Sequence, residues 1–110
     1  MTTRATDFTK TSFEEFDIDI DFTDRQPLGA TEISSSVFSA LEFDPKTRAT
    51  TDASSTVLDS TTGTTVSSVK ARCTVKAGTD GKGYRVIGRA TWDDGSKTEG
   101  AVIMRVEDHD

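Results

Sequence analysis

The sequence predicts an all-β fold in which antiparallel strands form a thin two-layer sandwich. Runs of alternating apolar and polar residues recur along the chain, as expected for strands with one buried face. The chain contains 19 Thr and 11 Ser, a composition that favours strands and loops over helices. Only 33% of its 110 residues are hydrophobic, so the core must be small, and a thin sandwich suits that supply better than a thick α/β core.

Residues 66–107 contain the clearest pattern, three runs in which apolar residues alternate with polar ones. Their apolar-face members are Val69, Ala71, Cys73, Val75 and Ala77, then Tyr84, Val86, Gly88, Ala90 and Trp92, then Val102, Met104 and Val106. The glycine-rich segment 78–83 and the segment 93–97, which contains an Asp-Gly pair, are typical of hairpin turns. We therefore expect three consecutive antiparallel strands with one buried face.

Residues 1–12 are polar apart from Phe8, which predicts a flexible N-terminal arm ahead of a single domain at residues 13–108. Termini of this kind are disordered unless something holds them. Phe8 and Phe13 could anchor the arm in a neighbouring subunit. We expect removal of residues 1–12 to weaken such an assembly while leaving the stability of the isolated fold unchanged.

The first strand of the domain is expected between residues 13 and 22, where aromatic and aliphatic residues alternate with acids. Asp17, Asp19 and Asp21 share the outer face of this strand. They do not form an EF-hand loop, because Phe22 and Leu28 stand where that loop needs glycine and glutamate. Two interpretations remain: a candidate site for a hard cation, or a solvated acidic edge that discourages other strands from adding to it.

A second strand is expected within residues 30–43, with Ile33 and Val37 as core residues and with Leu41 and Phe43 continuing the alternation. It should end at the Asp-Pro turn that follows Phe43. The three consecutive serines in this segment lack the glycine-flanked elbow and the nearby base that a nucleophilic serine needs.

Residues 46–65 are rich in Thr, Ser and Asp. They predict one or two short strands, one of them near residues 55–58. An exposed loop should follow at residues 59–64.

The net charge of −6 and the sequence pI near 4.7 argue against sequence-independent nucleic-acid binding, which depends on Lys and Arg neutralising phosphates. A basic partner surface suits the protein as a whole. A local basic patch is still conceivable, since Arg85, Arg89 and Arg105 could share the outer face of the sheet.

Groups with catalytic potential are few. Cys73 is either a nucleophile or intermolecular bridge, or a small buried hydrophobe; the second fits its place on an apolar face without a nearby histidine. His109 is the only histidine and lies next to the C-terminal residue. No zinc-ligand spacing occurs, and segment 78–83 joins two expected strands, so it reads as a turn and not as a phosphate loop. Tyr84 and Trp92 are expected in the core, with Trp92 near its rim so that its N–H finds a partner. We predict neither an enzyme nor a cofactor.

No basic region followed by an apolar run opens the chain, so no signal peptide is predicted. No stretch approaches the roughly 18 apolar residues of a membrane span. We expect the protein to be made and folded in the cytosol.

Several pieces of the sequence resemble small virion proteins of tailed bacteriophages, of the type called fibre-tail adaptors or neck proteins. The pieces are Gly78-Thr79-Asp80-Gly81, Tyr84-Arg85-Val86, Ala90-Thr91, Asp94-Gly95, Glu99, Val102, Val106 and Asp108, with Asp19-Ile20-Asp21-Phe22 and Ile33-Ser34-Ser35-Ser36 upstream. The resemblance covers residues 18–108. Residues 44–65 and the first dozen residues depart from the pattern.

This resemblance implies an immunoglobulin-like β-sandwich that serves as a non-enzymatic building block of a virion. Its expected location is the neck, the head-tail junction or a fibre attachment site. Its expected partners are other virion proteins in a symmetric multi-copy assembly, such as portal, adaptor, tail or capsid subunits, with no nucleic acid and no membrane. The alternatives are a capsid decoration protein and a free module that binds carbohydrate or Ca²⁺.

Overall fold

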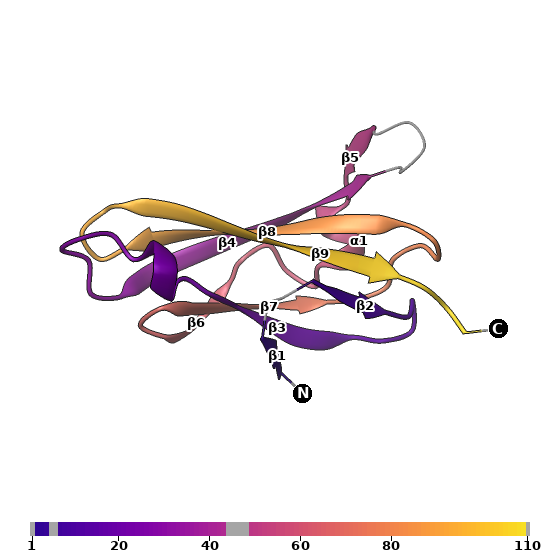
Figure 1. The fold of residues 1–110 in the computed structure, drawn as a ribbon, viewed down its shortest axis with the longest axis horizontal. Helices are drawn as coiled ribbons and strands as arrows, with labels where there is room; N and C mark the ends of the chain where they lie inside the picture. Colours follow the sequence, from indigo (N-terminus) through magenta and orange to yellow (C-terminus); the bar gives the residue numbers. More distant parts are fainter. Residues whose placement is uncertain (1, 5–6, 44–48, 110) are drawn as a thin grey trace.

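The computed structural model describes residues 2–4, 7–43 and 49–109, which form two sheets packed as a sandwich (Figure 1). Strands account for 56% of the chain and helix for 7%, which confirms the all-β prediction. The described helical segments are single turns, η1 (Thr23–Arg25) and α1 (Ser54–Val57).

The first sheet has the strand order β1-β3-β7-β6. It consists of β1 (Thr2–Arg4), β3 (Phe16–Asp21), β7 (Lys70–Val75) and β6 (Thr64–Ser67). We call it sheet A. Strand β3 is the strand predicted from the alternation of apolar and acidic residues. It pairs antiparallel with β7, and β1 adds to it in parallel.

The second sheet, sheet B, has the order β2-β9-β8-β4-β5. It consists of β2 (Phe8–Lys10), β9 (Lys97–Val106), β8 (Gly83–Trp92), β4 (Ile33–Phe43) and β5 (Thr50–Asp52). Strands β8 and β9 form the hairpin that the Asp-Gly pair predicts, and Gly95 has φ +88° in its turn.

The predicted connection between the first two runs of the C-terminal region is wrong. Strand β7 does not pair with β8; it lies in sheet A, and residues 77–82 cross from one layer to the other. Ala77, Gly78 and Gly81 have φ of +47°, +99° and +85°, so this link needs left-handed backbone conformations that glycine adopts easily. Alternation identifies a buried face, but it does not say which sheet contributes that face.

Strand β4 explains a second error. Ile33 is buried as predicted, but Val37 is 55% exposed. The register of β4 against β8 shifts between Ile33 and Ser35, so a bulge inverts the alternation beyond it. Ser36, Phe38 and Ala40 therefore face the core.

The prediction of a strand near residues 55–58 is also wrong. Those residues belong mainly to α1, whose Val57 is buried. Leu58 then forms an isolated bridge with Val75. The exposed loop predicted at residues 59–64 is present over residues 59–62, but β6 already begins at Thr64.

The N-terminal segment differs from the predicted unstructured arm. Strand β2 pairs in parallel with the edge of β9, aligning Phe8 with Met104 and Lys10 with Val106. Lys10 is buried, and its Nζ donates hydrogen bonds to the carbonyl oxygens of Thr11 (2.6 Å) and Ala77 (2.5 Å). Burial lowers the pKa of this ammonium group. Residues 8–10 are therefore part of the sandwich.

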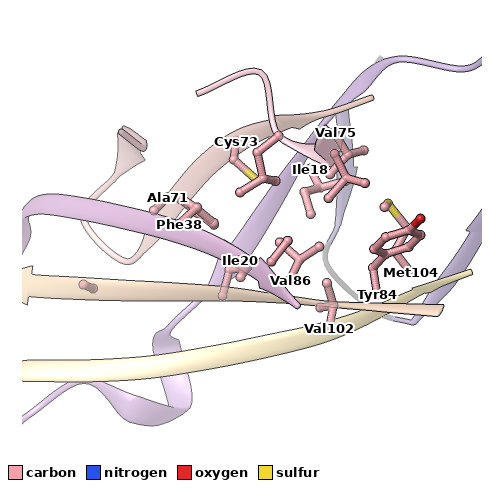
Figure 2. Packing of buried hydrophobic residues seen from close by; sticks show 14 of the residues in the cluster. Ile18, Ile20, Phe38, Ala71, Cys73, Val75, Tyr84, Val86, Val102 and Met104 are labelled. Carbon is pink, nitrogen blue, oxygen red and sulfur yellow. The ribbon is translucent and has the colours of Figure 1, made fainter. Parts of the chain in front are cut away.

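The core lies between the two sheets. Figure 2 shows Ile18 and Cys73 from sheet A together with Val86, Val102 and Met104 from sheet B. Trp92 and Tyr84 are buried, as predicted from the sequence. Both polar tips are satisfied, since Trp92 Nε1 donates to Thr98 Oγ1 (2.9 Å), and Tyr84 Oη accepts from Thr79 N (2.8 Å) and donates to Glu42 Oε1 (3.0 Å).

Asp93 fixes the β8–β9 turn to the start of β4, which yields a pH prediction. Its carboxylate accepts hydrogen bonds from the hydroxyl and backbone N–H of Thr31, which lower its pKa. A carboxylate with a lowered folded-state pKa binds fewer protons than in the unfolded chain. The stability that the Asp93 carboxylate contributes is thus fully present above its ordinary pKa of 3.8. It is lost as the pH falls through the lower pKa of the folded state.

The unfolding free energy of the wild type should therefore be lower at pH 3 than at pH 7, and Asp93→Asn should make this decrease smaller. Denaturant titration of both proteins at the two pH values measures the decrease. An equal decrease in the variant and the wild type would contradict this role of Asp93.

Candidate interaction surface

The outer face of sheet B presents a mixture of apolar and cationic side chains. On β8, Arg85 and Arg89 point outward and are exposed, while Val86 and Ala90 point into the core. The register places Arg85 opposite Ile103 and Gly83 opposite Arg105 of β9. Arg85, Arg89 and Arg105 therefore share one face, which confirms the basic patch that the sequence suggested.

Apolar residues flank these arginines on the two neighbouring strands. On β4, Val37, Leu41 and Phe43 point outward because of the bulge, and on β9 Ile103 points outward opposite Arg85. Leu41, Phe43 and Ile103 are half-buried by their neighbours and keep part of their surface exposed. In Figure 1, sheet B forms the upper layer and β5 rises from it at one end. Clustered outward apolar residues on a sheet are typical of interaction sites.

A hollow of about 200 Å³ opens on this face between Leu41, Phe43, Thr50, Arg85 and Ile103. Gly83 allows Phe43 to lie flat against β8, because a Cβ at this glycine would come within 2.4 Å of the Phe43 ring. A second depression, of about 450 Å³, lies toward the other end of the face beside Val37 and Arg89. We call the hollow beside Phe43 the Phe43 hollow.

The charges on the outer face of sheet B are unbalanced. Arg89 forms an exposed ion pair with Glu99 (3.3 Å), a type of pair that contributes little. Among the residues the structure describes, Arg85 and Arg105 have no ion-pair partner. This face is consequently cationic in a chain whose net charge is −6.

The outer face of sheet A has the opposite character. Asp17 accepts a hydrogen bond from Thr74 Oγ1 (2.7 Å), and Asp19 pairs with Arg72 through two contacts of 2.8 and 3.3 Å. The hydrogen bond to Asp19 raises the pKa of Arg72. Asp21 accepts from the N–H and hydroxyl of Thr23.

These contacts bear on the candidate cation site at Asp17, Asp19 and Asp21. The three carboxylates are distributed along β3, and each one has a protein donor. Within residues 2–4, 7–43 and 49–109, no group of three His, Cys, Asp or Glu side chains is placed to hold a metal ion.

The groups considered for covalent chemistry are separated from one another. Cys73 is buried in the core, where desolvation raises the pKa of its thiol to about 12 and keeps it protonated. His109 is exposed beyond the end of β9. Ser36 is buried, and its Oγ has no hydrogen-bond partner; it packs against Gly63, which leaves no room for a substrate.

The two phenylalanines predicted as anchors have different environments. Phe8 is half-buried and packs against Phe16, with ring centroids 5.8 Å apart. Phe13 follows β2 and is 94% exposed. Only Phe13 is therefore available to a neighbouring molecule.

The sequence predicts the three arginines of this surface but not its apolar part. Simple alternation along residues 30–43 puts Val37 in the core, with Leu41 and Phe43 on the same face, whereas all three point outward. A signal was present, because residues 36–43 carry apolar residues in both phases of the alternation, at Phe38 and Ala40 as well as Val37 and Leu41. Such a strand is apolar on both faces.

No protein-family model and no curated protein sequence matches this chain. Among the described residues, no helix has the length and apolar character needed to cross a bilayer.

Proposed function

We propose that this chain is a non-enzymatic structural component of a tailed-phage virion, an immunoglobulin-like adaptor at the neck, the head-tail junction or a fibre attachment site. The observation that supports a docking role is the outer face of sheet B, where apolar side chains lie together with two arginines that have no ion-pair partner among the described residues. The sequence resemblance supports the assignment to a virion.

The chemistry of the surface suits protein docking. Apolar area removed from water supplies the main driving force for association, and arginine is enriched in interface cores because it forms directional pairs with carboxylates. Leu41, Phe43 and Ile103 supply the first component, and Arg85 and Arg105 supply the second. A partner with exposed carboxylates around an apolar side chain would complement both.

The same surface argues for a binding role over a catalytic one. Its titratable groups include three arginines, Lys97 and Glu99, and arginine does not exchange protons near neutral pH. Cys73 lies on the other side of the sheet, in the core, and its thiol stays protonated. General acid-base or nucleophilic catalysis needs a group with a tuned pKa at the site.

Incorporation into particles tests this proposal. A phage that lacks this chain would be supplied in trans with the wild type or with the double variant Arg85→Glu/Arg105→Glu, and the chain would be quantified in purified particles. We expect at least a tenfold loss for the double variant. Arg25→Glu is the matched control, because Arg25 is exposed and lies in η1, outside this face. This variant should be incorporated normally.

Two results would refute the proposal. One is absence of the wild-type chain from purified particles, and the other is normal incorporation of the double variant. The binding-module alternative predicts that millimolar Ca²⁺ or a glycan raises the melting temperature, because a ligand that binds only the folded state stabilises it. The capsid decoration alternative predicts copies spread over the capsid surface instead of at one vertex.

A further inference from the structure

The loop between β2 and β3 presents an aromatic side chain next to two carboxylates. Phe13 is 94% exposed, and Glu14 and Glu15 beside it are also exposed. A phenylalanine side chain that is almost fully exposed does not stabilise its own fold, because its apolar surface is not removed from water. We call residues 12–15 the Phe13 loop.

Hydrogen bonds hold this loop in one conformation. Asp108 accepts from Ser12 N (2.6 Å) and Ser12 Oγ (2.8 Å), and Glu14 Oε1 accepts from Thr11 N (2.8 Å). Glu14 N also donates to Thr11 O (3.3 Å). The loop is thus tied to the segment that follows β9, which lowers the entropy cost of ordering its backbone when Phe13 binds a partner.

The Phe43 hollow has the complementary properties. Leu41, Phe43 and Ile103 supply its apolar lining, and Arg85 stands in its wall without an ion-pair partner among the described residues. Its volume of about 200 Å³ can hold a phenyl ring, since benzene occupies an engineered protein cavity of about 150 Å³. Within one molecule the hollow does not receive Phe13, whose ring remains exposed.

We propose that the chain self-associates by inserting Phe13 of one copy into the Phe43 hollow of a second copy. Glu14 and Glu15 of the first copy then face Arg85 and Arg105 of the second. The proposal rests on the assembly role proposed above and names a partner for it, namely a second copy of this chain. The ring buries apolar surface, and the carboxylates neutralise cations that have no ion-pair partner among the described residues.

The contact joins two different surfaces of the chain, so copies can associate head to tail. Alternatively, two copies related by a two-fold axis can each insert Phe13 into the hollow of the other. One aromatic residue with its flanking charges forms a small contact, which should be weak in a pair of free molecules. Repetition around a symmetry axis makes such a contact effective. We therefore expect weak self-association in solution and tighter association in a closed assembly.

Sedimentation velocity over micromolar to millimolar concentrations of the full chain tests the contact. The weight-average sedimentation coefficient of the wild type should rise with concentration and should rise less at high salt, because charges contribute. Phe13→Ser should weaken association at least tenfold. Leu28→Ser is the matched control, since Leu28 is equally exposed and lies outside both surfaces, and it should associate like the wild type.

A mixing experiment tests the pairing of the two surfaces. Phe13→Ser retains an intact hollow, and Arg85→Glu retains an intact loop while its hollow repels Glu14 and Glu15. Each variant alone should remain monomeric. An equimolar mixture should associate, because one loop and one hollow are still functional between them. Both substitutions lie at exposed positions, and circular dichroism with thermal melting verifies that the fold is kept.

Several outcomes would overturn the self-contact: a monomeric wild type at millimolar concentration, unchanged association of Phe13→Ser, or no association in the mixture. A monomeric wild type that binds a poly-glutamate peptide through Arg85 would assign the surface to a different acidic protein. That result would overturn the self-contact and leave the proposed function standing. Absence of the chain from particles would refute the proposed function whatever the sedimentation result.

Discussion

Replacing Phe38 by alanine is expected to lower the free energy of unfolding by about 4 kcal/mol. Phe38 is completely buried on the inner face of β4. Its ring fills the space that two glycines leave, because a Cβ added at Gly63 or Gly88 would lie 2.5 or 2.8 Å from it. Denaturant unfolding monitored by Trp92 fluorescence measures the change.

Phe13→Ala provides the control for that experiment. It removes the same side chain from a position that is 94% exposed, so the unfolding free energy should change by less than about 0.5 kcal/mol. Equal losses for the two variants would mean that β4 does not turn Phe38 into the core.

Deleting residues 1–12 is expected to destabilise the isolated protein by at least about 3 kcal/mol. The deletion removes the contact of Phe8 with the core and the pairing of β2 with β9. It also leaves the carbonyl oxygen of Ala77 without the Lys10 ammonium group. The structure thus reverses the expectation from sequence that this segment could be removed without loss of stability.

Two substitutions separate these contributions. Lys10→Met keeps an unbranched side chain of similar length but cannot donate hydrogen bonds, so it should cost about 2 kcal/mol. Thr9→Met places the same residue at the exposed neighbouring position and should be nearly neutral. Full stability of the truncated chain, measured by the same unfolding experiment, would show that β2 does not belong to the sandwich. Because the truncation affects the fold, its effect on particle incorporation cannot be assigned to a lost anchor.

The sequence was most informative where one residue type determines the local geometry. The Asp94-Gly95 pair located the β8–β9 hairpin, because glycine provides the positive φ that a tight turn needs. Alternation along β3 and β8 identified most of the buried residues of these two strands, including Tyr84 and Trp92. The outward position of Arg85 followed from the same alternation.

Long-range pairing and local irregularity could not be predicted. Alternation in β7 predicted a buried face. It did not predict the pairing of β7 with β3, which is more than 50 residues away in sequence. The bulge after Ile33 moved Val37 to the outside, and nothing in the consecutive serines marks it. Lys10 is buried because carbonyl oxygens from two segments converge on it, a tertiary arrangement that single-sequence patterns do not contain.

The apolar part of the candidate surface was missed for the same reason. Leu41 and Phe43 point outward only because of the bulge, and the hollow between them needs Gly83 on the adjacent strand. The opposite charges of the two outer faces also could not be predicted, because the sequence does not show which strands share a sheet. The arginines face outward from sheet B, whereas Asp17 and Asp19 face outward from sheet A.

The most direct test of the docking role is an electron cryomicroscopy reconstruction of purified phage particles that contain this chain. We predict symmetric copies at the neck or a fibre attachment site, with Leu41, Arg85 and Ile103 covered by a neighbouring subunit and with the outer face of sheet A, which carries Asp19, left uncovered. Particles that contain the chain with the outer face of sheet B open to solvent, or particles that lack the chain, would contradict the account.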